Sequence, residues 1–319
     1  MDQVSEIRNK IDIVALIQEF VPLKKMGRNF KANCPFHGEK TPSFVVSPER
    51  QIWHCFGCNK GGDVYTFLME YEHMEFPEAL RILADRAGVR LVNQAFDTGV
   101  SSKKETIYKL NRLAAEFYHY LLVKHQLGKI ALSYVLERRH IKTQTLNTFL
   151  LGFAPQTGNA LTTYLVKKKG YKKEDILEAG LATQRGSQLY DFFQGRLMFP
   201  LFDHRDNIIG FSGRILEDNE KTSKYINTRD TLAYHKGMTF FGLNSAKQAI
   251  KKEQNAILME GEFDVISSFQ EGITNAVAVK GTALTQDQVS LLARFTPMIS
   301  LCFDTDSAGQ EAFKRSLPL

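Results

Sequence analysis

The chain has 319 residues, of which 43% are hydrophobic and 24% charged; this composition excludes collagen-like, disulfide-scaffold and wholly disordered proteins and allows about two domains. No apolar run reaches the roughly 18 residues of a membrane-spanning helix and the first residues lack a signal peptide, so we expect a cytoplasmic protein without membrane contact. The net charge of +6 divides into +9 over residues 1–250 and −3 over residues 251–319, which favours a basic surface for a polyanion and an acidic end suited to divalent metal.

The first chemical feature along the chain is a group of three of the four cysteines with one histidine. Cys34 and His37 form one pair and Cys55 and Cys58 a second, each with two residues between its members. This spacing lets a tight turn direct both side chains at one ion, and four such ligands are typical of structural Zn²⁺. A disulfide is disfavoured, because a chain without a secretory signal is expected where thiols stay reduced.

Between the two pairs, residues 43–47 and 51–54 are predicted to be strands joined by a turn at residues 48–50. The pairs and the hairpin together predict a zinc ribbon. Basic and aromatic residues interleave around it, a pattern that suits single-stranded nucleic acid. As the alternative, we expect the thin core to take up at least half of five aromatic side chains, namely Phe30, Phe36, Phe44, Trp53 and Phe56.

The middle of the chain begins with residues 93–102, which are polar and small and predict a linker. Helices are expected over residues 105–149 and again, as two short helices, over residues 161–182. The lysines at 167–169 and 172–173 are interpreted as a solvated helix edge, with nucleic-acid binding as the alternative.

A basic hairpin is expected next. Residues 195–200 and 206–214 read as two apolar strands that meet at a turn, and we expect the hairpin to be half-buried. Arginines at the strand ends can present guanidinium groups to phosphate, although such arginines are as often simply solvated. Arg196 and Arg214 stand at the strand ends, and residues 224–228 and 235–237 add more donors.

The acidic end alternates short apolar strands with helices. Strands are expected at residues 256–259, 276–279 and 299–303, with helices over 263–270 and from Thr285 onward. Near-continuous apolar strands separated by helices predict a parallel sheet covered on both faces. Cys302 lies in the third strand, and we expect it to be a buried small hydrophobic residue.

Carboxylates follow the ends of these strands, where catalytic groups gather in parallel sheets. Glu260 ends the first strand, Asp264 comes four residues later, and Asp304 and Asp306 follow the third. Clustered carboxylates repel one another unless cations lie between them, so we predict a Mg²⁺ or Mn²⁺ site. A helix-capping role is the alternative for Asp306, and Glu262 is interpreted as a solvated acid at a helix start.

Three sets of motifs resemble bacterial replicative DNA primases. Residues 34–44 and 54–63 look like the Cys-His-Cys-Cys zinc domain of that family. Residues 196–200, 210–214, 224–228 and 235–237 resemble the basic RNA-polymerase core of the family. Residues 260–265, 281–285 and 304–309 resemble its TOPRIM fold, which type IA and II topoisomerases share.

The resemblance implies a multidomain α+β and α/β fold. Residues 1–95 would form a zinc ribbon domain, a β-hairpin sheet with helices, and residues 96–106 a linker. Residues 107–250 would form a mixed α+β basic subdomain, and residues 251–319 a parallel-sheet TOPRIM subdomain. The family's TOPRIM sheet and a helicase-contacting helical domain continue beyond the position of Leu319, so we expect a truncated chain in which the sheet is incomplete.

The implied activity is synthesis of short RNA primers from ribonucleoside triphosphates on single-stranded DNA at the replication fork. One structural Zn²⁺ would be held by Cys34, His37, Cys55 and Cys58. Glu260, Asp304 and Asp306 would be catalytic and, with Asp264, would hold Mg²⁺ or Mn²⁺. Template or nucleotide phosphates would contact Arg196, Arg214, Lys224, Asn227 and Lys236.

Two other functions stay open from sequence. One is a TOPRIM nuclease or topoisomerase, although the zinc module and the basic core argue against it. The other is a non-catalytic, zinc-dependent single-stranded DNA-binding fragment, because the metal-binding segment is expected to be incomplete.

Overall fold

The computed structural model describes residues 3–72, 74–91, 99–217, 222–280 and 284–318, which fall into two compact units, Met1–Ser102 and Lys103–Leu319. No helix in these ranges is both long and apolar enough to cross a bilayer. Residues 93–98 of the expected linker lie outside the described ranges.

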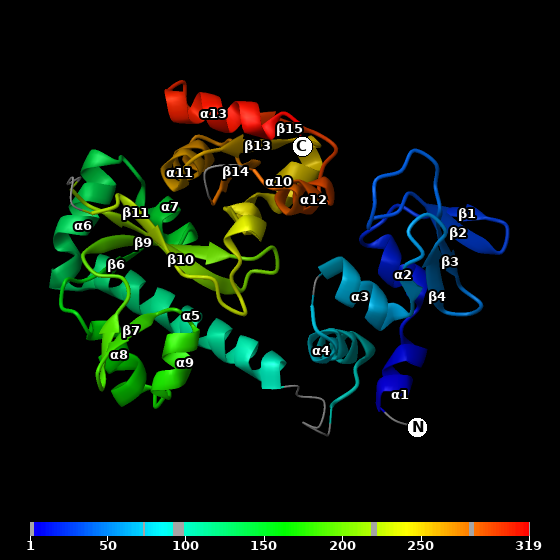
Figure 1. Cartoon of the computed structure of the whole chain (residues 1–319), viewed down its shortest axis with the longest axis horizontal. Helices are drawn as coiled ribbons and strands as arrows, with labels where there is room; N and C mark the ends of the chain where they lie inside the picture. Colours follow the sequence, from blue (N-terminus) through cyan, green and yellow to red (C-terminus); the bar gives the residue numbers. More distant parts are fainter. Residues whose placement is uncertain (1–2, 73, 92–98, 218–221, 281–283, 319) are drawn as a thin grey trace. The chain divides into compact units, whose positions relative to one another are not determined.

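The first unit contains a five-stranded antiparallel sheet, β1 to β5 in sequence order, accompanied by helices (Figure 1). The two strands predicted between the metal-ligand pairs are β3 and β4, and they pair with Val46 opposite Trp53. The predicted ribbon hairpin is therefore confirmed. The elements are α1 (Gln3–Lys10), α2 (Ile13–Gln18), β1 (Lys24–Met26), β2 (Asn29–Ala32), β3 (Phe44–Ser47), β4 (Ile52–Cys55), β5 (Gly61–Gly62), α3 (Val64–Glu72) and α4 (Phe76–Ala87).

Aromatic rings fill the core of this unit. Phe44 and Trp53 stack with their centroids 5.2 Å apart, and Phe67 of α3 meets the Trp53 ring edge-on at 6.1 Å. Phe36 packs against the same cluster and Phe30 lies at its margin, whereas Phe56 is 70% exposed. The expectation that the core takes at least half of these five aromatic side chains is confirmed.

The long helix α5 starts at Gly99, just before the second unit, rather than at the expected Glu105, and most of it belongs to that unit. Residues 99–106 therefore extend this helix. Lys103 in its first turns is ion-paired with Glu178 of α9, with 2.8 Å between Nζ and Oε1. The helical region comprises α5 (Gly99–Lys124), η2 (Gln126–Gly128), α6 (Lys129–Ser133), η3 (Tyr134–Arg138), α7 (Thr143–Thr148), α8 (Ala160–Thr163), η4 (Tyr164–Lys168) and α9 (Lys173–Glu178).

A four-stranded antiparallel sheet with the order β11-β10-β9-β6 forms the middle of this unit; we refer to it as the basic sheet. Its central strands, β9 and β10, are the predicted hairpin, but they are buried along almost their whole length instead of half-buried. The reason is that clusters of apolar side chains cover both faces, and both clusters include residues of α5. The strands are β6 (Gly152–Ala154), β9 (Arg196–Phe202), β10 (Ile208–Ile215) and β11 (Tyr225–Asn227), with a separate hairpin of β7 (Ala182–Arg185) and β8 (Gln188–Asp191).

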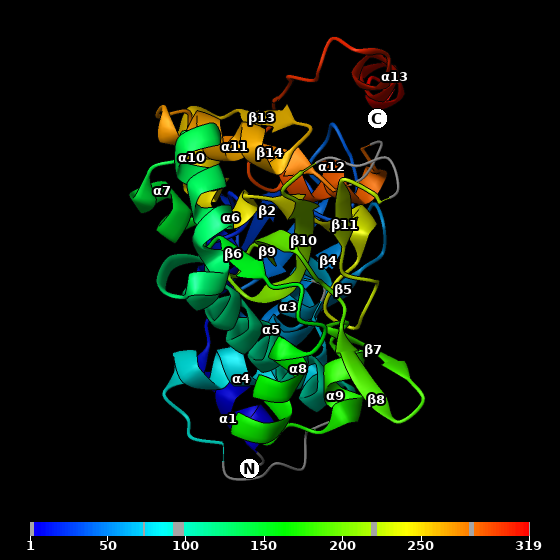
Figure 2. The same cartoon turned by 90° about the vertical axis from the view of Figure 1, so that its left-hand side faces the viewer.

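The acidic end forms a second four-stranded sheet with the order β12-β14-β13-β15. The three predicted strands pair in parallel, which confirms the α/β arrangement, and β12 adds an antiparallel edge. The helix α13 follows β15, and in Figure 2 it stands apart from the strands labelled β13 and β14. The elements are η5 (Lys236–Met238), β12 (Phe240–Phe241), α10 (Leu243–Glu253), β13 (Ala256–Met259), α11 (Glu262–Gln270), β14 (Ala276–Val279), α12 (Gln286–Ala293), β15 (Ile299–Leu301) and α13 (Ser307–Ser316).

Candidate metal and nucleic-acid sites

The predicted zinc ligands come together at the end of the β3–β4 hairpin. One ligand atom from each of Cys34, His37, Cys55 and Cys58 lies within 4.8 Å of the other three. The Cys34 and Cys58 sulfurs are 3.9 Å apart, and His37 Nδ1 is 3.7 Å from the Cys55 sulfur. Tetrahedral Zn²⁺ requires edges of about 3.5–3.8 Å between such ligands. The four side chains therefore fit a zinc ion.

Backbone N–H groups support the sulfurs. The amides of Gly57 and Cys58 lie 3.4 and 3.5 Å from the Cys55 sulfur, and the Phe36 amide lies 3.4 Å from the Cys34 sulfur. Burial opposes ionisation of Cys55, but hydrogen bonds from Ser43 and these amides lower its pKa to about 7. Burial raises the pKa of Cys34 to about 12. A divalent cation favours the thiolate form of all three cysteines.

Sequence reasoning missed Glu39, which stands behind the ligands. Its carboxylate accepts hydrogen bonds from the backbone amides of Cys34 (2.7 Å) and Ser43 (2.9 Å). Its Oε2 is 3.3 Å from Nε2 of His37, the ring nitrogen that faces away from the sulfurs. Carboxylates in this position orient a histidine ligand and increase its basicity. The available signal was an acid two residues after the predicted histidine ligand.

The predicted acidic site lies at the carboxyl ends of β13 and β15, where Glu260, Asp264, Asp304 and Asp306 form what we call the carboxylate rim. The Asp304 amide donates to Oε1 of Glu260 at 2.9 Å, so these two turns are joined. A Cβ on Gly309 would lie 2.6 Å from that Glu260 oxygen and 2.1 Å from the Asp304 carbonyl oxygen. Only glycine fits this approach, which holds α13 against the rim.

Each of the other two acids makes a local hydrogen bond. Oδ2 of Asp264 accepts from the Gly261 amide at 2.9 Å, and Oδ1 of Asp306 accepts from the Gly309 amide at 2.8 Å and caps α13. The alternative of a helix cap is thus realised for Asp306. Burial raises the pKa of Asp264, and the charges of Asp304 and Glu262 raise it further.

The four rim acids do not close into one ligand group. Among the described residues, the cysteines and histidine of the first unit are the only set of three or more such side chains close enough to share an ion. Mg²⁺ keeps several of its waters and is commonly held by one or two carboxylates, so the donors present still fit a hydrated divalent ion.

The predicted basic residues differ in how they are held. Arg214 is buried, donates from Nη1 to the Tyr225 hydroxyl at 3.0 Å and lies over the Phe263 ring, 5.4 Å from its centroid. Lys224 and Lys236 are exposed. Of these three cations, Arg214 therefore lies at the start of α11.

Arg196 fits its expected phosphate-binding role least. Its guanidinium is buried and donates to the backbone carbonyls of Gly213 (3.0 Å), Ser223 (3.0 Å) and Lys224 (3.2 Å). Burial also lowers its pKa. These bonds hold the end of β10 and the residues just before β11, and they direct the guanidinium at the chain's own backbone.

Arg139 is a second residue that sequence reasoning missed. Its guanidinium lies 4.5 Å from the Phe263 centroid, and its Nε donates to the Tyr134 hydroxyl at 2.8 Å. Arg214 lies over the same Phe263 ring. The first turn of α11 is therefore flanked by two guanidinium groups from distant segments, and no local pattern in the sequence brings them together.

Two expectations about single residues are wrong. Glu262 is not a solvated acid but is buried and ion-paired with Lys280. Burial opposes ionisation of Glu262, but the Lys280 ammonium and the Ser212 hydroxyl lower its pKa. Cys302 is exposed rather than buried, because it follows β15 at the edge of the sheet.

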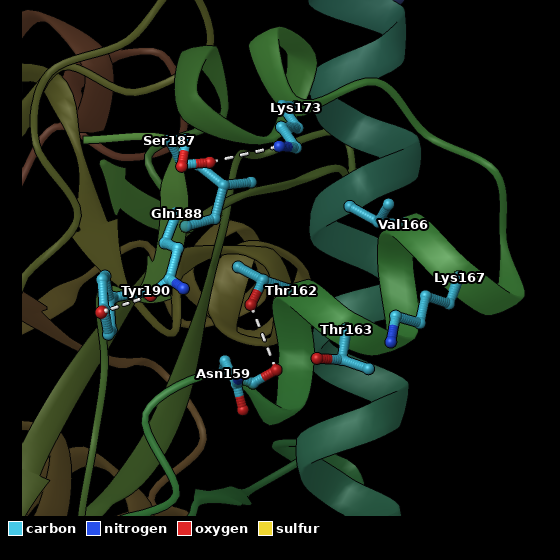
Figure 3. A pocket seen from close by; sticks show the side chains of 10 residues that line it. Asn159, Thr162, Thr163, Val166, Lys167, Lys173, Ser187, Gln188 and Tyr190 are labelled. Carbon is cyan, nitrogen blue, oxygen red and sulfur yellow. Dashed lines mark hydrogen bonds between the residues drawn. The ribbon is translucent and has the colours of Figure 1, made fainter. Parts of the chain in front are cut away.

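A cavity of about 380 Å³ lies apart from these groups, between α8–η4 and the β7–β8 hairpin (Figure 3). Lys167 and Lys173 line it, and Lys173 Nζ donates to the Ser187 carbonyl at 3.3 Å. None of its ten lining residues is a predicted site residue. The five lysines at 167–169 and 172–173 are exposed, as expected for a solvated helix edge.

Comparison with known families assigns each part of the chain. A model described as a CHC2 zinc finger matches residues 1–98, one described as the DNA primase catalytic core N-terminal domain matches residues 117–247, and a Toprim-like model matches residues 257–319. The crystal structure of the Aquifex aeolicus primase zinc-binding and RNA polymerase domains is 38% identical. It matches 100% of this chain and 76% of that one, with a TM-score of 0.62. The chain belongs to the DNA primase family.

Curated members of the primase family agree with this assignment. DNA primases of Listeria monocytogenes and Geobacillus stearothermophilus are each 41% identical over 317 residues, covering 97% and 98% of this chain. The chain spans about half the length of these relatives, 50% and 52%. A primase catalytic domain solved bound to single-stranded DNA is 33% identical over 67% of this chain and 66% of that one, with a TM-score of 0.60.

Proposed function

We propose that the chain is the template-binding and catalytic part of a DNA primase, a DNA-directed RNA polymerase that makes short RNA primers on single-stranded DNA for replication. The observation that carries this proposal is the order of its sites. A zinc-ligand group, a basic sheet and a carboxylate rim follow one another in a chain whose full length matches the Aquifex aeolicus primase structure. It would act in the cytoplasm at the replication fork, with domain boundaries near residues 95, 106 and 250.

The first domain would bind template and take part in choosing the start site. Cys34, His37, Cys55 and Cys58 would hold one structural Zn²⁺, which ties the two turns together where the core is thin. The exposed Phe56 ring beside this group and the exposed lysines of β1 supply the stacking and charged groups that single strands need.

The carboxylate rim would hold Mg²⁺ or Mn²⁺ through Glu260, Asp304 and Asp306, with Asp264 as a further ligand. When bound, such ions neutralise phosphate charge and favour attack of a ribose 3′-hydroxyl on the α-phosphate with loss of pyrophosphate. The chain's part is to keep Glu260 and Asp304 adjacent, through the hydrogen bond from the Asp304 amide. Burial raises the pKa of Asp264 and the neighbouring charges of Asp304 and Glu262 raise it further, so a bound cation would favour its charged form.

The basic sheet would bind template and the phosphates of ribonucleoside triphosphates through Arg214, Lys224, Asn227 and Lys236. Oδ1 of Asn227 is buried and accepts no hydrogen bond from the residues that the structure describes; as an acceptor, it would pair with an N–H or O–H group of a ligand rather than with a phosphate oxygen. We assign Arg196 a supporting role behind this surface. The RNA primer is the product, and the replicative helicase would bind through a further domain that relatives carry.

A non-catalytic single-stranded DNA-binding role is the second candidate. The observation that favours it is the open arrangement of the rim acids, which form no closed ligand group within the described ranges.

Primer synthesis by the full-length protein separates the two functions. Asp304→Ala removes a rim carboxylate, and we expect synthesis from ribonucleotides on single-stranded DNA to fall at least about a hundredfold, because several kcal/mol of charge stabilisation are lost. Asp287→Ala, which removes an exposed acid of α12, is the matched control and should leave synthesis unchanged. DNA binding, measured in parallel by fluorescence anisotropy, should be the same for both. If the unaltered protein binds DNA but makes no primers, the second candidate stands.

A further inference from the structure

Glu262 and Lys280 form a buried ion pair next to the carboxylate rim. Their side chains are only 5% and 7% exposed, and Nζ of Lys280 donates to Oε1 of Glu262. Losing one partner of a buried pair is strongly destabilising, yet an apolar pair of the same volume is often equally stable or more so. Stability alone therefore does not account for two charges at this place.

The pair joins the ends of neighbouring strands. Glu262 is the first residue of α11, two residues after Glu260 and two before Asp264. Lys280 directly follows β14, which pairs in parallel with β13. The turn that carries two rim acids is thus tied to the carboxyl end of the next strand in the sheet.

The same turn contacts the basic sheet. Phe263, the next residue, packs against Phe199 of β9 with centroids 5.3 Å apart and lies under the Arg214 guanidinium. Burial raises the pKa of Tyr225, and the charge of Glu262 raises it further. The first turn of α11 is therefore where the carboxylate rim, the end of β14 and the basic sheet meet.

We propose that Glu262 and Lys280 are a positioning pair that holds this turn, so that Glu260 and Asp264 keep one position relative to Arg214 and Tyr225 when a divalent ion and a nucleotide bind. The Lys280 ammonium also neutralises the Glu262 carboxylate. Without this ion pair, Glu262 would compete with Glu260 and Asp264 for the divalent ion. This proposal rests on the proposed nucleotidyl transfer.

The test replaces both charges at once in the full-length protein. Glu262→Met/Lys280→Met keeps volume and leaves no unpaired charge, so we expect it to unfold at nearly the parent's temperature. We expect its dissociation constant for Mn²⁺, measured by titration calorimetry, and the Mn²⁺ concentration for half-maximal primer synthesis to rise about tenfold, as on loss of groups that support metal ligands. Lys103→Ala/Glu178→Ala removes an exposed Lys–Glu pair of the same unit and should change neither quantity.

Unchanged Mn²⁺ binding and metal dependence in a folded double variant would make the pair an ordinary core contact and overturn the proposal. Glu262→Gln/Lys280→Met, which keeps a polar group in the turn, serves the same comparison if the first variant does not fold. A parent protein that makes no primers while Mn²⁺ binding still weakens in the double variant would refute the proposed function and support the positioning pair.

Discussion

Arg196 is a charged residue whose hydrogen bonds stabilise the fold instead of binding a ligand. It lies in a strand whose other residues are apolar, and its planar guanidinium reaches three carbonyls, two of which precede β11. A fork of fixed geometry suits this task, and a lysine ammonium does not reproduce it. Arg196 thereby places β11, which carries Tyr225 and Asn227, against β10.

Substitution of Arg196 distinguishes a structural from a phosphate-binding role. Arg196→Met leaves buried carbonyl oxygens without donors and should lower the free energy of unfolding by about 2–4 kcal/mol, measured by chemical denaturation. Arg196→Lys should lose most of the same amount although it keeps the charge. Arg185→Met, at an exposed position, is the control. The structural role would be contradicted if the lysine variant were as stable as the parent and the methionine variant lost only DNA binding. Arg196 would then be a phosphate-binding residue.

At the scale of elements, the zinc-ligand group depends on one hairpin and the turns on either side of it. Glu39 links these parts, because it accepts from the amides of Cys34 and Ser43 and faces the His37 ring. Burial opposes ionisation of Glu39, but the hydrogen bonds from Ser43 lower its pKa. The charged form is the one that orients a histidine ligand.

Glu39→Gln should therefore weaken zinc retention. We expect about a tenfold to hundredfold lower affinity, the usual effect of losing a carboxylate behind a histidine ligand. The measurement is competition with a zinc chelator, followed by a colour indicator. Glu49→Gln, on the exposed turn of the same hairpin, should retain zinc like the parent. Equal retention by the two variants would show that His37 needs no carboxylate.

The elements that the sequence predicts well are those set by local spacing. Cys34 and His37 stand three positions apart, and β13, β14 and β15 are short apolar runs, so neighbours along the chain suffice to predict them. The pairing of Glu262 with Lys280 joins residues 18 positions apart, and Arg196 reaches carbonyls up to 28 positions away. Whether such charges are exposed depends on tertiary contacts that no local pattern contains.

At the scale of the molecule, the two units have separate hydrophobic cores. The core of the first contains Trp53, the only tryptophan of the chain, which is almost fully buried. The second unit has its own three clusters of buried side chains, none of which includes a zinc ligand. We therefore expect zinc to stabilise the first unit alone.

Removal of zinc tests this independence. A strong chelator, or Cys58→Ser, should unfold the ribbon because a structural zinc site contributes its binding energy to folding. Trp53 fluorescence should shift to the red, while a cooperative thermal transition of the second unit persists in circular dichroism. Cys302→Ser, which changes the exposed thiol outside the cluster, should leave the fluorescence unchanged. Loss of both units in a single transition would contradict this separation.

The short edge strand β12 limits where domains can be exchanged between related primases. It lies before the boundary expected at residue 250, yet it pairs with β14 of the second sheet. Thr285 and Gln288 at the start of α12 donate to the carbonyls of Gly237 and Thr239, in and just after the turn that carries Lys236. A chimera of two relatives would therefore preserve these contacts only if the exchange point fell before residue 235. The segment exchanged with the second sheet would then also carry Lys236, one of the predicted phosphate-binding residues.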